Sequence, residues 1–127
     1  MSFAWADFNG FAQEIIQHPA LNSTIEVVCR TAISRAYYAA FCTAYAFLVN
    51  VEHTYIDQTR DAHAQVIAGF QGHSDKQRQR ISVHLKTLRA QRNTADYDLV
   101  PTQAMDTYTA QDCIDLAEEI LAIVKSL

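Results

Sequence analysis

Apolar residues recur at intervals of three and four along most of the chain, a spacing typical of amphipathic helices. No segment shows the alternation of apolar and polar residues that would indicate a strand. The pattern therefore predicts five helices. They cover residues 3–17, 23–50, 61–70 and 74–96, and a last helix that starts at residue 107 or 109 and ends at 125.

Capping signals set the predicted ends of these helices. The spacing of Ser23 and Glu26 predicts a capping box, in which each side chain would bond the backbone N–H of the other residue. Ser74 followed by Gln77 repeats the pattern at the fourth helix. Pro19 disfavours helix in the residue before it, so we expect the first helix to end there.

Short connections between long helices favour antiparallel neighbours. We therefore expect an all-α fold: an up-and-down four-helix bundle with an additional short helix, over residues 61–70. The second helix carries apolar residues on more than one face and should be the central one. A chain of 127 residues has the size of a single domain, residues 1–127. A bundle by itself assigns no activity.

Composition narrows the possible functions. The formal net charge is −4, so binding to nucleic acid would need a local basic surface. The longest uncharged stretch, residues 36–51, is shorter than the ~20 apolar residues of a membrane-spanning helix, so we expect no membrane segment. The start of the chain lacks the basic region of a signal peptide. Three cysteines without a CxxC pair indicate a reduced, cytoplasmic protein.

Motifs for metals and cofactors are missing from the sequence. The five histidines are scattered singly and form no HExxH or other paired arrangement. The three glycines are isolated, which excludes a glycine-rich phosphate loop. We therefore predict no metal and no cofactor.

Six of the ten basic residues fall within seventeen positions of the fourth predicted helix. This basic segment is either a solvated helix face or a surface that binds phosphates. Its members are Lys76, Arg78, Arg80, Lys86, Arg89 and Arg92.

Arg92 differs from the other basic residues. At about 100° per residue it projects between Ile81 and Leu85, near the middle of the apolar stripe. A guanidinium there needs a carboxylate, a carbonyl or a bound phosphate, because removing it from water without a partner is costly. Asp96, four residues further on, is the nearest candidate. The pair either serves packing alone or belongs to a binding site.

Polar residues follow Arg92 to the end of the helix. The array is suited to bind a phosphodiester through Arg92 and to orient a reacting hydroxyl through Asn93. Tyr97 is a poor general base at neutral pH, because a tyrosine hydroxyl has an ordinary pKa of about 10. On the second helix, Arg35 stands beside two tyrosines and either lines the same cleft or packs the helices together.

Two segments carry a resemblance to a known family. Residues 34–41, SRAYYAAF, and residues 88–99, LRAQRNTADYDL, resemble the HEPN domain superfamily, and the order and lengths of the predicted helices agree over nearly the whole chain. The resemblance implies a helical bundle that pairs as a homodimer. It also implies the motif of the active members, which are metal-independent endoribonucleases. In that motif an arginine holds the scissile phosphate, the next polar residue orients it, and a histidine moves the proton of the 2′-hydroxyl.

The chain matches this motif only in part. Arg92 and Asn93 match the first two positions. The histidine position is Tyr97 with four intervening residues, and Asp98 or Leu99 with five or six, so it is unmatched in each case. All five histidines precede Arg92, so a replacement would have to fold into the cleft from elsewhere. His84, the nearest in sequence, projects about 80° away from Arg92. The sequence keeps the binding half of the motif and lacks its histidine.

Three hypotheses follow. The first is a dimeric HEPN-type protein that binds RNA or a nucleotide, with weak or no catalysis, in a toxin-antitoxin or phage-defence setting. The second is an active ribonuclease in which Tyr97 or Asp96 replaces the histidine. The third is a non-catalytic partner of a nucleotidyltransferase-like antitoxin. The candidate catalytic residues are Arg92, Asn93 and Tyr97, and the candidate binding residues are Arg35, Arg89, Arg92 and Asp96.

Overall fold

The computed structural model describes residues 3–18, 24–72, 74–98 and 105–127, which form helices and loops only. The prediction of an all-α fold is confirmed. The elements are α1 (Asp7–Gln17), α2 (Ile25–Ala46), a π-helical continuation of α2 (Phe47–Val51), α3 (Ala62–Gln71), α4 (Lys76–Tyr97) and α5 (Thr107–Ser126).

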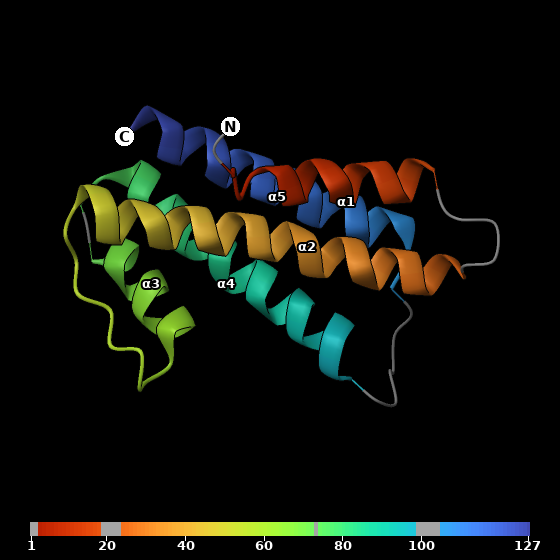
Figure 1. Cartoon of the computed structure of the whole chain (residues 1–127), viewed down its shortest axis with the longest axis horizontal. Helices are drawn as coiled ribbons and strands as arrows, with labels where there is room; N and C mark the ends of the chain where they lie inside the picture. The colour runs from red at the N-terminus through yellow and green to blue at the C-terminus, as the bar shows by residue number, and fades with distance from the viewer. Residues whose placement is uncertain (1–2, 19–23, 73, 99–104) are drawn as a thin grey trace.

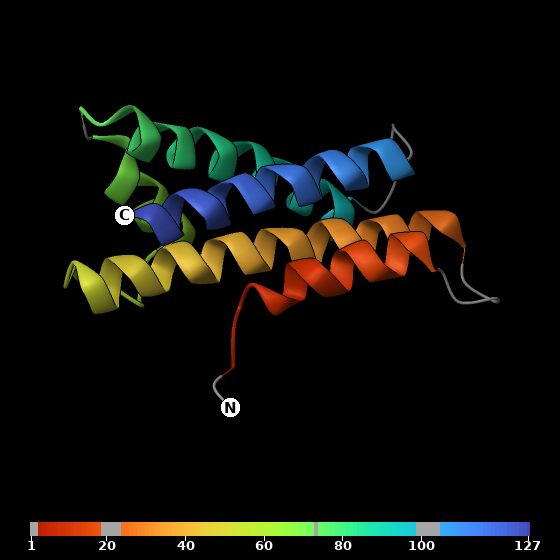
Figure 2. The same ribbon diagram turned by 90° about the horizontal axis from the view of Figure 1, so that it is seen from above.

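The central helix is α2, which packs against α1, α4 and α5 (Figure 1). The four long helices run alternately up and down, and the short α3 lies against α4. Seen from above, α1 lies along α2 on one side and α4 and α5 lie on the other (Figure 2). The side chains of α2 are thus enclosed from several directions.

Small side chains allow this close packing around α2. Its alanines at every fourth position are fully buried and let neighbouring backbones approach. These residues are Ala32, Ala36, Ala40 and Ala44. Larger apolar side chains from α4 and α5, such as Leu85 and Ile120, fill the space between the helices. Within the described part of the chain, no helix combines the length and apolar character needed to cross a membrane.

Two predicted helix caps differ from the structure. The cap of α2 is Thr24, whose hydroxyl accepts a hydrogen bond from the Val27 N–H at 3.3 Å. Ser23 lies outside the described residues. The cap of α4 is Asp75 rather than Ser74, because the Asp75 carboxylate accepts the N–H of Gln77 at 2.9 Å. In both places two adjacent residues are good caps, and the pattern alone could not rank them.

The first helix begins at Asp7 instead of residue 3. The aromatic rings before it pack on one another: Phe3 lies 4.9 Å from Trp5 and 5.8 Å from Phe8 between ring centroids. This clustering folds the preceding segment back onto the start of α1, so that it does not extend the helix.

We expect the core between α2, α4 and α5 to carry much of the stability. Leu85 is fully buried on α4, and Leu85→Ala should lower the free energy of unfolding by about 3 kcal/mol. Val83 on the same helix is 57 % exposed, so Val83→Ala should change it by less than about 0.5 kcal/mol. Urea unfolding followed by circular dichroism measures both. Equal effects would contradict the assigned core face of α4.

Candidate functional site

The C-terminal end of α4, which carries the partial HEPN motif, is fastened to α2 by Arg30. Its Nη1 donates hydrogen bonds to the backbone carbonyls of Thr94 and Ala95, at 3.0 and 2.9 Å. Its Nε donates to Glu26 at 3.3 Å. The Thr94 carbonyl also accepts the Asp98 N–H at 3.3 Å, and a cation at the C-terminal carbonyls of a helix complements the helix dipole. Arg30 therefore fixes the position of the last turn of α4.

Arg92 lies in this last part of α4 and is surrounded by the polar residues that follow it. Its Nε is 3.0 Å from Asp96 Oδ2 in an ion pair whose geometry is not that of a hydrogen bond. Its Nη1 donates to Asn93 Oδ1 at 3.3 Å, and its Nη2 donates to the Tyr97 hydroxyl at 3.4 Å. The Arg92 side chain is 17 % exposed, so its guanidinium points inward but still reaches the surface.

Two aromatic rings contact the same guanidinium. The Cζ of Arg92 lies 5.7 Å from the ring centroid of Tyr37 and 5.2 Å from that of Tyr97. Tyr37 is fully buried, whereas Tyr97 is 64 % exposed. Both contacts favour the charged arginine, and together they hold the cation between the core and the solvent.

Arg35 on α2 joins this group through a chain of hydrogen bonds. Its Nη2 donates to the Ser34 hydroxyl at 3.3 Å, and that hydroxyl donates to Asp96 Oδ2 at 3.1 Å. The Arg35 guanidinium also lies over the ring of Tyr38, 5.0 Å from its centroid. The structure therefore brings Arg35 and Arg92 to opposite ends of one network centred on Asp96.

Arg89 faces a different element. Its Nη2 is 2.8 Å from Asp61 Oδ2, and Asp61 is the N-terminal cap of α3. Together with Lys86 and Asn93, Arg89 lines a groove of 440 Å³ between α3 and α4. Hydrogen bonds from Arg89 and from the Ala64 N–H keep the pKa of Asp61 below its ordinary value. Arg89 thus lies beside the Arg92 group and ties α3 to it.

Ion pairs neutralise much of the basic segment. Arg78 pairs with Glu52, and Arg80 pairs with Glu119 at 3.2 Å. With Arg89 and Arg92 included, four of its six residues face a carboxylate. The segment is thus neither a bare basic surface nor a fully solvated face.

A histidine does reach the site, although the sequence pattern did not identify it. The Tyr37 hydroxyl is 2.6 Å from Nδ1 of His63, which α3 carries. His84, the histidine nearest to Arg92 in sequence, instead lies 3.1 Å from Glu119 on α5. No local motif marks His63, because α3 has to pack against α2 and α4 before the two residues meet.

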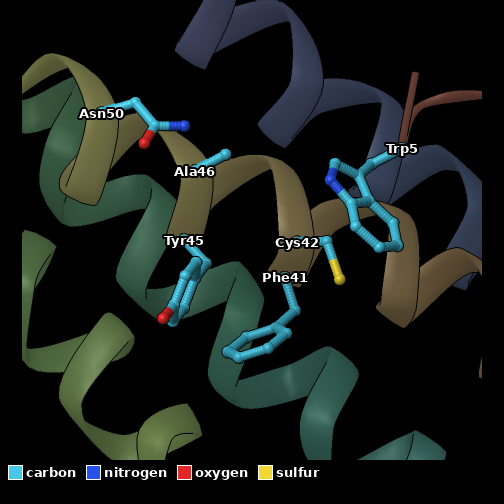
Figure 3. A pocket seen from close by; sticks show the side chains of 6 residues that line it. All are labelled: Trp5, Phe41, Cys42, Tyr45, Ala46 and Asn50. Carbon is cyan, nitrogen blue, oxygen red and sulfur yellow. The ribbon is translucent and has the colours of Figure 1, made fainter. Parts of the chain in front are cut away.

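A pocket of 350 Å³ lies further along α2 (Figure 3). Trp5, from the segment before α1, forms one wall, and the aromatic rings of Phe41 and Tyr45 form another. Asn50 supplies an amide at one end. Burial raises the pKa of the Cys42 thiol in this pocket to about 11, so the thiol is neutral. Aromatic walls with one amide suit a planar heterocycle.

The family model of the HEPN domain matches residues 19–127, and the chain belongs to this family. The matched region includes α2 to α5 and therefore every residue around Arg92 described above. Membership supports a nucleotide- or RNA-related role in general, since HEPN domains commonly dimerise and bind RNA. No curated protein and no solved structure matches the chain.

Arg30→Ala should lower the free energy of unfolding by about 1.5 kcal/mol, because it removes hydrogen bonds from a charged group to two helix-terminal carbonyls. Arg60 is the matched control: its side chain is 81 % exposed and pairs only with Asp57. Arg60→Ala should lower the free energy of unfolding by less than about 0.5 kcal/mol. Urea unfolding of the two variants is the measurement. Equal stabilities would show that Arg30 does not hold the end of α4.

Proposed function

We propose that this protein binds single-stranded RNA or a nucleotide through a phosphate contact at Arg92. The observation that carries the proposal is the Arg92 guanidinium itself, which contacts the motif residues Asn93, Asp96 and Tyr97 and still reaches the surface. Arginine presents a planar fork of donors that matches a phosphate. Because the chain carries a net charge of −4, RNA would bind locally rather than over the whole surface.

Two further arginines extend this contact. Arg35 lies at one end of the Asp96 network, and Arg89 lines the groove between α3 and α4. An RNA sugar-phosphate backbone that follows these residues would meet three guanidiniums, those of Arg35 on α2 and of Arg89 and Arg92 on α4. The aromatic pocket of Figure 3 would then receive a base, because every base has a face that stacks on aromatic rings.

The motif is degenerate in this proposal. Tyr97 takes the place of the histidine, but its hydroxyl already contacts Arg92. Asp96, the other replacement considered from the sequence, is engaged by Arg92 and Ser34. We therefore assign both residues to holding the arginine and contacting the ligand.

The oligomer and the biological setting are part of the same proposal. We propose a homodimer in which the exposed Tyr97 and Val27, 64 % and 58 % exposed, become covered and two copies of Arg92 approach each other. The setting proposed is a toxin-antitoxin or phage-defence system. A nucleotidyltransferase-like partner that covers the same face instead is the competing hypothesis. Analytical ultracentrifugation of the purified chain separates the two.

Arg92→Ala should weaken binding of a single-stranded RNA by about 10- to 100-fold at fixed salt, because a charge-assisted contact to phosphate is lost. The control is Arg80→Ala, which removes the same charge from α4 at a residue paired with Glu119. Fluorescence anisotropy of a labelled RNA measures both. Equal affinities for the two variants would remove Arg92 from the binding site.

Trp5 offers a direct probe of the aromatic pocket, because it is the single tryptophan of the chain and is 38 % exposed. A base that stacks in the pocket should quench its fluorescence. An abasic sugar-phosphate oligomer, which carries the same charges, should leave the emission unchanged. Tyr45→Ala should reduce the quenching by RNA. Unchanged emission at saturating RNA would place the bases elsewhere.

A further inference from the structure

A buried tyrosine and a half-buried histidine form a polar pair that the proposed phosphate contact does not use. Tyr37 is fully buried in α2, and its hydroxyl lies 2.6 Å from Nδ1 of His63. The imidazole stacks on the ring of Phe41, with 4.2 Å between centroids. Any polar group would satisfy the hydroxyl. The imidazole does more, because the hydrogen bond at Nδ1 and the stacking on Phe41 together fix the direction of its second nitrogen, Nε2.

Tyr37 also places His63 close to Arg92. The Cζ of Arg92 lies 5.7 Å from the ring centroid of Tyr37, and the centroid of the His63 ring lies 5.6 Å from the same ring. Arg89 approaches as well, since it pairs with Asp61, two residues before His63. The charges of both arginines act on the imidazole, so His63 lies in the same neighbourhood as the arginines that we propose bind phosphate.

The surroundings of His63 favour its neutral form. Burial lowers its pKa below the ordinary value of about 6.5, and the charges of Arg89 and Arg92 lower it further, against an opposing effect of Asp61. Among the residues that the structure describes, Nε2 has no hydrogen-bond partner. When Nδ1 carries the proton and donates it to the Tyr37 oxygen, Nε2 presents a lone pair.

We propose that His63 is the catalytic residue that takes the place of the histidine missing after Asn93, so that the site cleaves RNA. This inference rests on the proposed phosphate contact at Arg92 and adds a reaction to it. The proton donor would be a ribose 2′-hydroxyl, and the proton acceptor would be Nε2 of His63.

The reaction is a transesterification within the RNA. As Nε2 removes the proton, the 2′-oxygen forms a bond to the adjacent phosphorus, and the bond from phosphorus to the 5′-oxygen breaks. The 5′-oxygen takes a proton from water, and the imidazolium returns its proton to the hydroxide that remains. The products are a 2′,3′-cyclic phosphate and a 5′-hydroxyl. Arg92 stabilises the charge that develops on the phosphate.

Phe41 connects this reaction to the aromatic pocket. One ring of the pocket wall in Figure 3 is Phe41, and the same ring stacks on His63. A base bound in the pocket would therefore place its ribose beside the imidazole. The order along α2 is then base at Phe41 and Tyr45, ribose at His63 and phosphate at Arg92.

The test uses the full chain, a labelled single-stranded RNA and the same sequence as DNA. We expect slow cleavage of the RNA to 2′,3′-cyclic phosphate ends and binding of the DNA without cleavage. His63→Gln should lower the cleavage rate by about 100-fold or more while the Kd for RNA stays unchanged. His18→Gln, at an exposed histidine after α1, is the matched control and should cleave as the wild type does.

Two readouts separate proton transfer from a structural role. The rate of the wild type should rise with pH along a limb whose midpoint lies below the ordinary histidine pKa, and this limb should be absent in His63→Gln. Added imidazole should restore part of the rate of His63→Gly. Tyr37→Phe, which leaves the ring and removes the hydroxyl, should lower the rate less than His63→Gln does.

The outcomes distinguish this inference from the proposed function. RNA binding that depends on Arg92, without any cleavage by the wild type across about pH 5 to 9, overturns the role of His63 and leaves the binding proposal intact. Cleavage that persists in His63→Gln does the same. If RNA binding does not depend on Arg92, both the proposed function and the role of His63 are overturned. The pH profile of the wild type needs no variant, so a misfolded substitution leaves the test decisive.

Discussion

The buried hydroxyl of Tyr37 is the interaction on which the arrangement of the site depends. It lies in a helix face made mostly of alanine, where the neighbouring helices approach closely and leave no exposed surface on the tyrosine. An unpaired hydroxyl there would cost about 1–3 kcal/mol. His63 is the partner, so α3 has to lie where its imidazole can reach α2. The same tyrosine ring also contacts the Arg92 guanidinium.

Toward the N-terminal end of α2, further polar side chains also fix the position of a neighbouring helix. Arg30 holds the last carbonyls of α4, and Ser34 holds Asp96. With Tyr37, these residues follow one another at intervals of three and four, so they lie on one face of α2. A single stripe of one helix thus positions the end of α4 and its guanidinium. The site is built on rigid helices, with no described loop residue contacting Arg92.

The sequence predicted those features that depend on residues close together along the chain. Helical spacing predicted all five helices and the inward direction of Arg92, and the i, i+4 relation predicted its pairing with Asp96. The role of His63 could not be predicted in this way, because twenty-six positions separate it from Tyr37 and only the packing of α3 joins them. Arg30 was missed for the same reason: its partners on α4 are sixty-four and sixty-five positions away.

Arg89 serves two tasks that compete for one guanidinium. It fastens the start of α3 to α4 through Asp61, and it lines the groove beside the proposed phosphate contact. A polyanion that bound Arg89 would leave the Asp61 carboxylate without its cation. The ion pair that holds the start of α3, the helix that carries His63, would then be lost. Entry of the ligand and the rigidity of α3 are therefore mechanically coupled. The empty and the occupied protein should differ most in the hydrogen-exchange protection of this short helix.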